Sequence, residues 1–253
     1  MPDEKWLAEV EKYRDKLISP VDLNEYFENK ELYGVKTVCY PFGTITLPTG
    51  ELIGCDPLVF LDDDQDSFYI KAPTGEFPVE LCIVEPFNGD CARYAAMRIT
   101  YNGKRAVRFE LALTGTEDIS ELAQFEEGDY FGFPVDAGLG CFCDRAAQKA
   151  FTAFDEEMYR KHGESFNFYN DYMAALFAES YKADPRYQRE GGDFLNYTVP
   201  GTGYHIPICN SGFGDGMYPV YWGYDENGNI CQTVMQFIDL KLAYTDEEED
   251  EDD

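Results

Sequence analysis

The sequence predicts an α+β protein with a mostly antiparallel, sandwich-like β core, an N-terminal helix and a helical insertion near residues 145–186. Three observations predict this class. From Val35 onward, apolar and polar residues alternate with the period of two that is typical of strands. Helical spacing of apolar residues is found mainly at the N-terminus and in the insertion. Turn dipeptides such as Asn227-Gly228 join short β-like segments.

The first helix is expected over residues 3–17, and Pro20 ends it because proline has no N–H to donate within a helix. A second, shorter helix is expected over residues 21–30. The first helix is expected to present one apolar face, made of Trp6, Val10, Tyr13 and Leu17.

Strands are expected to follow one another as a meander through the middle of the chain. Asn102-Gly103 is expected to form the hairpin turn between residues 95–101 and 107–113. The helical insertion is expected to break near residues 162–165 and to end near Pro185. Further strands are expected over residues 129–135, 194–199, 204–209, 217–224 and 230–239.

The formal net charge of −29 is the strongest compositional feature of the chain. The last eight residues, 246–253, are all acidic, so the preceding 245 residues still carry −21. We expect residues 1–245 to form a single globular domain and the acidic tail to be disordered, because dense like charges repel one another. A field of this sign attracts basic proteins and repels nucleic acid and anionic lipid. Acidity that serves only solubility is the alternative.

The chain shows no sign of a membrane span or an export signal. No window approaches the roughly 18 uninterrupted apolar residues of a span, and the first residues lack a basic-then-apolar pattern. The eight cysteines lie mostly in apolar, strand-like runs, where a reduced thiol behaves as a small hydrophobe. The expectation is a cytoplasmic protein without a cofactor.

Two glycine-rich loops, residues 136–144 and 211–218, are the candidate site. Because segments that end strands tend to lie at the same end of a sheet, we expect the two loops to adjoin. The Gly138-x-Gly140 spacing before a helix is similar to a phosphate-binding turn. It lacks the third glycine of a dinucleotide site and the lysine of a Walker loop. Asp144 is explained more simply as a helix N-cap.

Catalytic candidates also lie in these loops. Cys141 precedes the predicted helix, and a thiol at a helix N-terminus has a lowered pKa. His205 could serve as its base, with Asp136 or Asp215 orienting the imidazole. Asp215 lies between two glycines and is otherwise expected to accept backbone N–H bonds within its own loop. No metal site is expected, since the only Cys doublet, at 141 and 143, is spaced more tightly than zinc pairs are.

Five motifs occur in order along the chain. They are Leu47-Pro48-Thr49-Gly50, Cys55-Asp56-Pro57-Leu58, Gly75-Glu76-Phe77-Pro78-Val79, residues 135–142 and residues 211–219. Together they resemble a bacterial family catalogued as domain of unknown function 4241, over roughly residues 35–240. Cys143 departs from the pattern, where a methionine is expected. The resemblance implies no established activity, and it marks as family pattern Asp56, Asp136, Cys141, Asp144, Ser211, Asp215, Tyr218, Tyr221 and Asp225.

Two functions from different classes fit these observations. The first is a binding module for a basic protein, similar in profile to a toxin-neutralising immunity protein. Its candidate binding residues are Asp56, Asp144, Ser211, Tyr218, Tyr221 and Asp225. The second is a hydrolase or transferase with its site between the two glycine-rich loops. Its candidate catalytic residues are Asp136, Cys141, His205 and Asp215. We favour binding, because the set of catalytic groups is incomplete.

Overall fold

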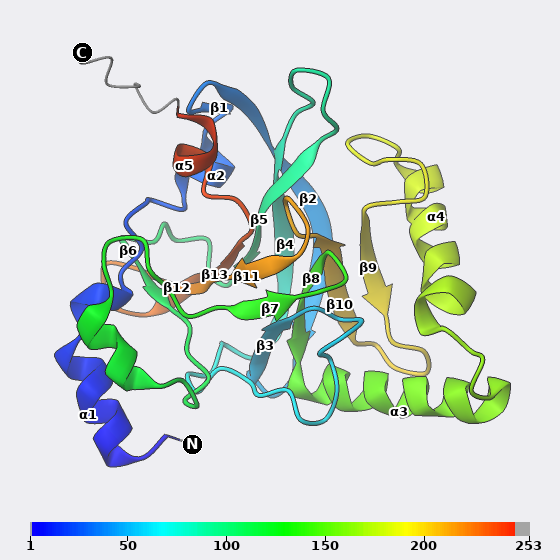
Figure 1. Ribbon diagram of the computed structural model, residues 1–253, viewed down its shortest axis with the longest axis horizontal. Coiled ribbons are helices and arrows are strands. Elements are labelled where there is room, and N and C mark those ends of the chain that lie inside the picture. Colours follow the sequence, from blue (N-terminus) through cyan, green and yellow to red (C-terminus); the bar gives the residue numbers. More distant parts are fainter. Residues whose placement is uncertain (1, 246–253) are drawn as a thin grey trace, which may run out of the picture.

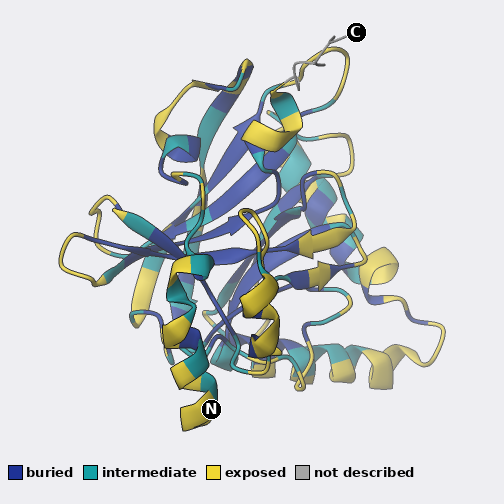
Figure 2. Cartoon of the chain, turned by 60° about the vertical axis from the view of Figure 1, so that its left-hand side comes forward, coloured by how far each residue is buried: buried dark blue, intermediate teal, exposed yellow. Residues whose placement is uncertain are grey.

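The computed structural model describes residues 2–245, and the acidic tail over 246–253 lies outside the described residues. The fold is α+β, with two antiparallel sheets packed face to face and helices on the outer face of the smaller sheet (Figure 1). The predicted fold class is therefore confirmed. Within the sandwich, burial is greatest in the central strands, and the helices expose one side to solvent (Figure 2).

The larger sheet has seven strands. In spatial order they are β1 (Glu31–Leu32), β2 (Val35–Leu47), β4 (Gly75–Val84), β5 (Arg93–Thr100), β13 (Ile230–Gln236), β12 (Val220–Tyr224) and β6 (Arg108–Leu111). The smaller sheet has the order β3 (Leu52–Cys55), β8 (Leu139–Asp144), β10 (His205–Asn210) and β9 (Phe194–Thr198). A separate two-stranded ribbon pairs β7 (Phe133–Val135) with β11 (Gly216–Tyr218).

Most helices lie near the ends of the chain or in the predicted insertion. The N-terminal elements are α1 (Glu4–Lys12), the 3-10 turn η1 (Arg14–Leu17) and α2 (Glu25–Glu28). The insertion holds α3 (Arg145–His162), the π-helical turn η3 (Tyr169–Met173) and α4 (Ala174–Ala183). The remaining helices are the 3-10 segment η2 (Ile119–Gln124) and α5 (Leu240–Tyr244). None of the helices within residues 2–245 combines the length and the apolar character that crossing a membrane requires.

The predicted hairpin at Asn102-Gly103 is wrong. Strands β5 and β6 flank this turn in sequence, but β13 and β12 lie between them in the sheet. The C-terminal hairpin, which turns at Asn227-Gly228 as predicted, inserts there and pairs with both strands. A turn dipeptide predicts that the chain reverses direction locally. It does not determine which strand pairs with the strands on either side of the turn.

Strand β8 separates two hydrophobic cores. All six of its residues are buried. Phe142 faces the larger sheet, whereas Cys141 and Cys143 face α3 and α4, because side chains alternate along a strand. Gly140 is required for the close approach of the sheets, since a Cβ there would lie 2.5 Å from the ring of Phe237.

Asp144 ends β8 and joins three segments of the chain. Its carboxylate is fully buried and accepts a hydrogen bond from the Ala146 backbone N–H at 2.8 Å, so it caps α3. It also accepts bonds from the Thr49 and Gly50 backbone N–H groups, each at 3.1 Å, and from the Thr49 hydroxyl. The capping role expected from the sequence is therefore one part of a larger structural role.

Asp144→Asn should lower the free energy of unfolding by about 3 kcal/mol, because an amide in this pocket leaves buried N–H donors without a charged acceptor. Urea denaturation followed by circular dichroism measures the change. Asp63→Asn is the matched control, since Asp63 is exposed, and it should change stability by less than about 0.5 kcal/mol. A loss below about 1 kcal/mol for Asp144→Asn would contradict the joining role.

Candidate functional site

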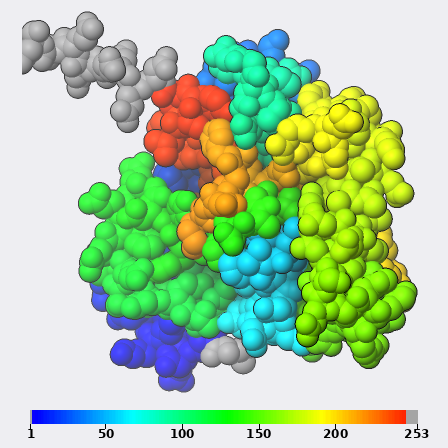
Figure 3. All heavy atoms as spheres, turned by 45° about the vertical axis from the view of Figure 1, so that its right-hand side comes forward, coloured from blue at the N-terminus to red at the C-terminus, as the bar shows by residue number. Residues whose placement is uncertain are grey.

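The two glycine-rich loops lie side by side, as the sequence predicts. The Ser211 backbone N–H donates to the Gly138 carbonyl at 3.0 Å, next to the register pair of Asn210 with Leu139. The β7–β11 ribbon joins the same two segments a second time, with Gly216 opposite Val135. In Figure 3 the orange segment around residue 215 lies against the green segment around residue 135.

Only the first part of the 136–144 segment is a loop. Residues 139–144 form β8, so Cys141 lies within a strand and not at a helix N-terminus, which corrects the sequence interpretation. Cys141 is fully buried, and its Sγ lies 3.8 Å from Sγ of Cys55 on the neighbouring strand. A thiol enclosed in this way cannot reach a substrate.

The predicted Cys141–His205 dyad does not form. Cys141 lies directly opposite Ile208, and His205 is three residues from Ile208 along β10. Because side chains alternate, His205 and Cys141 point to opposite faces of the sheet, and about 10 Å of strand separates them. His205 instead lies opposite Thr198, with its Nδ1 3.0 Å from the threonine hydroxyl.

Asp136 and Asp215 flank the ribbon, one directly after β7 and the other directly before β11. Each is one residue beyond the last register pair, Val135 with Gly216, and both are exposed. The Asp215 carboxylate accepts no hydrogen bond from residues 2–245, so the structural role predicted for it is wrong.

Asp56 holds the backbone that directly follows β7 in place. Its carboxylate is fully buried and accepts backbone N–H bonds from Asp136 at 3.1 Å and Ala137 at 2.6 Å. The other oxygen accepts from the Leu58 N–H at 2.9 Å. Asp56 is therefore a buried anchor of the first loop and does not face a ligand.

Ser211 and Tyr218 close the second loop. The Ser211 hydroxyl donates to the Gly214 carbonyl at 2.8 Å. The Tyr218 hydroxyl lies 2.9 Å from the Ser211 carbonyl and 2.6 Å from the Gly214 carbonyl. Gly212 needs its positive φ of 58° for this turn, and a Cβ there would lie 2.7 Å from Ile238. Both polar side chains are buried and hold the loop shape.

Tyr221 lies in β12, and Asp225 directly follows this strand. Tyr221 is buried, and burial raises the pKa of its hydroxyl above the ordinary value. Asp225 accepts N–H bonds from Asn227 at 2.9 Å and Asn229 at 3.0 Å, which closes the C-terminal hairpin. A hydrogen bond from Lys104 Nζ at 2.8 Å lowers the pKa of Asp225 to about 2.

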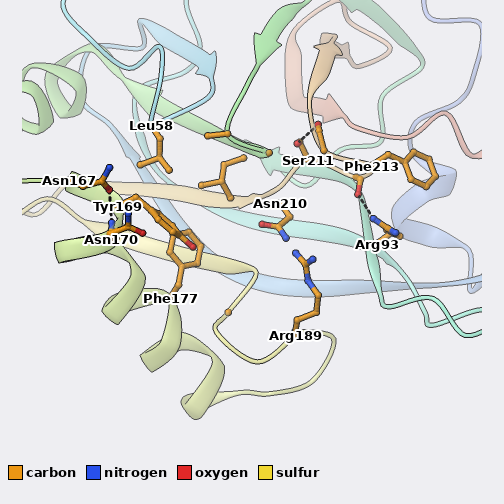
Figure 4. A pocket seen from close by; sticks show the side chains of 16 residues that line it. Leu58, Arg93, Asn167, Tyr169, Asn170, Phe177, Arg189, Asn210, Ser211 and Phe213 are labelled. Carbon is orange, nitrogen blue, oxygen red and sulfur yellow. Dashed lines mark hydrogen bonds between the residues drawn. The ribbon is translucent and has the colours of Figure 1, made fainter.

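A cleft of about 540 Å³ opens between the two loops and the helical insertion (Figure 4). The loops contribute residues 137–139 and 210–214, and the insertion contributes Asn167, Tyr169, Asn170 and Phe177. Arg93 and Arg189 are the charged residues that line it. No local sequence pattern signals this cleft, because its walls come from segments far apart in the chain.

The geometry defines an α+β sandwich with a surface cleft beside two joined glycine-rich loops. The chain belongs to the family described as protein of unknown function (DUF4241), which matches residues 45–235 and confirms the family resemblance. No curated protein and no solved structure matches the chain.

Asp225 makes stability depend on pH in acid. Its folded-state pKa of about 2 is below the ordinary value, so its contribution is present above about pH 4 and is lost as the pH falls towards 2. Asp225→Asn should therefore flatten the fall in melting temperature between pH 4 and pH 2. The control Glu226→Gln changes an exposed neighbour and should keep the wild-type slope. Equal slopes in Asp225→Asn and wild type would contradict the assignment.

Proposed function

We propose that the protein is a cytoplasmic binding module that captures a basic protein partner through the exposed end of the β7–β11 ribbon. We define the ribbon surface as Asp129, Tyr130, Asp136, Asp215 and Met217. The main support for the proposal is the combination, on this surface, of exposed apolar side chains with exposed carboxylates that form no salt bridge within residues 2–245.

The chain segment that contains β7 is acidic along its length. Residues 109–144 contain nine acidic residues and no lysine or arginine. The exposed acidic residues of this segment are Asp118, Glu121, Glu126, Glu127, Asp129 and Asp136. None of these six forms a salt bridge within residues 2–245, where the segment's ion pairs are those of the buried Glu110. A concentrated negative field speeds the encounter with a basic protein and selects against acidic ones.

The apolar part of the ribbon surface supplies contact area. Tyr130 is 40% exposed and Met217 is 50% exposed. The Tyr130 hydroxyl donates to the Met217 carbonyl at 3.0 Å, which holds the tyrosine against the ribbon. Tyrosine and methionine are enriched at protein interfaces, where a rigid aromatic ring gives contact area at little cost in conformational entropy. The surface therefore offers both components that a protein interface uses.

The state of the cysteines supports the cytoplasm. All eight are free thiols, including Cys55 and Cys141 with their sulfur atoms 3.8 Å apart. Neighbouring thiols persist in reducing compartments and form disulfides in oxidising ones. An acidic protein that captures a basic one resembles a toxin-neutralising immunity protein. This comparison depends on the charge profile of the chain.

The hydrolase or transferase alternative has less support. Cys141 and His205 face opposite sides of a sheet, and Cys141 is enclosed. The cleft has arginine and tyrosine as its ionisable lining groups. Neither residue type titrates near neutral pH in the way that general acid–base catalysis requires.

The test begins with a photocrosslinking amino acid at Met217 and, as a control, at Tyr159, which is 42% exposed on α3. The partner captured only from position 217 is identified, purified and titrated against variants. The double variant Asp136→Asn, Asp215→Asn should weaken binding about five- to tenfold at low salt, mainly through slower association.

The matched control for this change in charge is Glu156→Gln, Glu157→Gln, which removes two exposed carboxylates from α3. It should leave the dissociation constant within about twofold of wild type. A captured partner that is neutral or acidic would overturn the proposal, and so would equal weakening by both double variants.

A further inference from the structure

We propose that the cleft between the glycine-rich loops and the helical insertion binds a small organic anion, a carboxylate or phosphate monoester attached to a flat ring. This site is separate from the ribbon surface, and its occupant has the opposite charge to the basic partner. Acidic residues outnumber basic ones by 49 to 20 in the chain, yet the charged residues lining the cleft are Arg93 and Arg189.

Arg189 is held in place by a buried carboxylate. Asp193 is 2% exposed and accepts from Arg189 Nε at 2.9 Å and Nη2 at 2.6 Å. The Asn210 side chain, which also lines the cleft, donates to the same oxygen at 2.7 Å. Arg189 Nη1 forms no hydrogen bond with residues 2–245, so this donor is available to a ligand while the rest of the group is fixed.

Arg93 approaches the cleft from the larger sheet. Its Nη1 donates to the Gly212 carbonyl at 3.3 Å, and its guanidinium lies 5.4 Å from the centre of the Phe213 ring. Asp90 binds Nε and Nη2 at 2.9 and 3.0 Å. Arg93 and Arg189 line the cleft (Figure 4). Asp90 and Asp193 are not among its lining residues, so a ligand meets the arginine side chains and not their carboxylate partners.

The remaining walls match an anion that carries a ring. Tyr169 presents aromatic surface, with the buried Phe177 ring packed beside it, and Asn170 and Asn210 present polar groups. Tyr169 and Asn170 belong to η3, and single π-helical turns occur frequently at functional sites. The volume of about 540 Å³ lies within the range of small-molecule sites, roughly 300–1,000 Å³.

The class of ligand follows from the donors. A planar guanidinium can donate hydrogen bonds to two oxygens of a carboxylate or phosphate. The uncharged amide side chains in the cleft favour neither an anion nor a cation. Aromatic walls add contact to a flat apolar group. A cation is disfavoured here, because it would approach two guanidinium groups.

The experiment measures binding of four probes to the full chain by calorimetry and thermal shift. Benzoate and phenyl phosphate are the anions, benzyl alcohol is neutral and benzylamine is the cation. The decisive variant is Asn170→Asp, because the Asn170 side chain forms no hydrogen bond within residues 2–245 and its replacement adds a negative charge without removing a contact. Asn227→Asp adds the same charge at the tip of the distant C-terminal hairpin.

We expect at least one of the two anions to bind. Benzyl alcohol should bind more weakly than that anion, and benzylamine should show no binding. Asn170→Asp should weaken anion binding about tenfold or more, with Asn227→Asp within about twofold of wild type and unchanged circular dichroism in both. Arg189→Met should also lose binding, with Arg160→Met, an exposed arginine of α3, as its control. Failure of both anions to bind, binding of benzylamine, or equal loss in both Asn→Asp variants would overturn the proposal.

Discussion

Strand β8 is the constraint on which the rest of the structure depends. It is buried on both faces, it pairs with β3 and β10, and its two sides belong to different cores. Its first residue follows the loop that contacts Ser211, and its last residue, Asp144, caps α3 and fixes the 49–50 turn. Both proposed binding surfaces therefore lie on segments that β8 places.

Most polar residues of the family pattern stabilise loops. Asp56 holds the first glycine-rich loop, Ser211 and Tyr218 close the second, and Asp225 closes the hairpin. Each satisfies backbone groups that burial would otherwise leave unpaired, which is costly. Because these side chains point inward, the groups left for a partner are the exposed ones of the ribbon surface, such as the carboxylates of Asp136 and Asp215 and the half-exposed side chain of Met217.

Local patterns in the sequence predicted the elements well and their neighbours only in part. The 3.6-residue period found the helical insertion, and Asn227-Gly228 found the closing hairpin. The order of strands depends on long-range pairing. The Asn102-Gly103 dipeptide therefore led to the wrong prediction that β5 and β6 pair as a hairpin. Because side chains alternate along a strand, His205 and Cys141 point to opposite faces of the sheet. This separation can be recognised only once the register of β8 with β10 is known. Arg93 and Arg189 both line the cleft but lie far apart in the sequence, so no local pattern records the cleft.

The two glycine-rich loops are held together as one rigid unit. The Ser211 backbone N–H, which is buried and donates to the Gly138 carbonyl, reports on this contact directly. Amide hydrogen exchange under native conditions tests it, because a rigid unit exchanges only when the whole fold opens. We expect Ser211 to exchange as slowly as the amides of β8. Exchange of Ser211 as fast as that of the exposed Phe213 would contradict it.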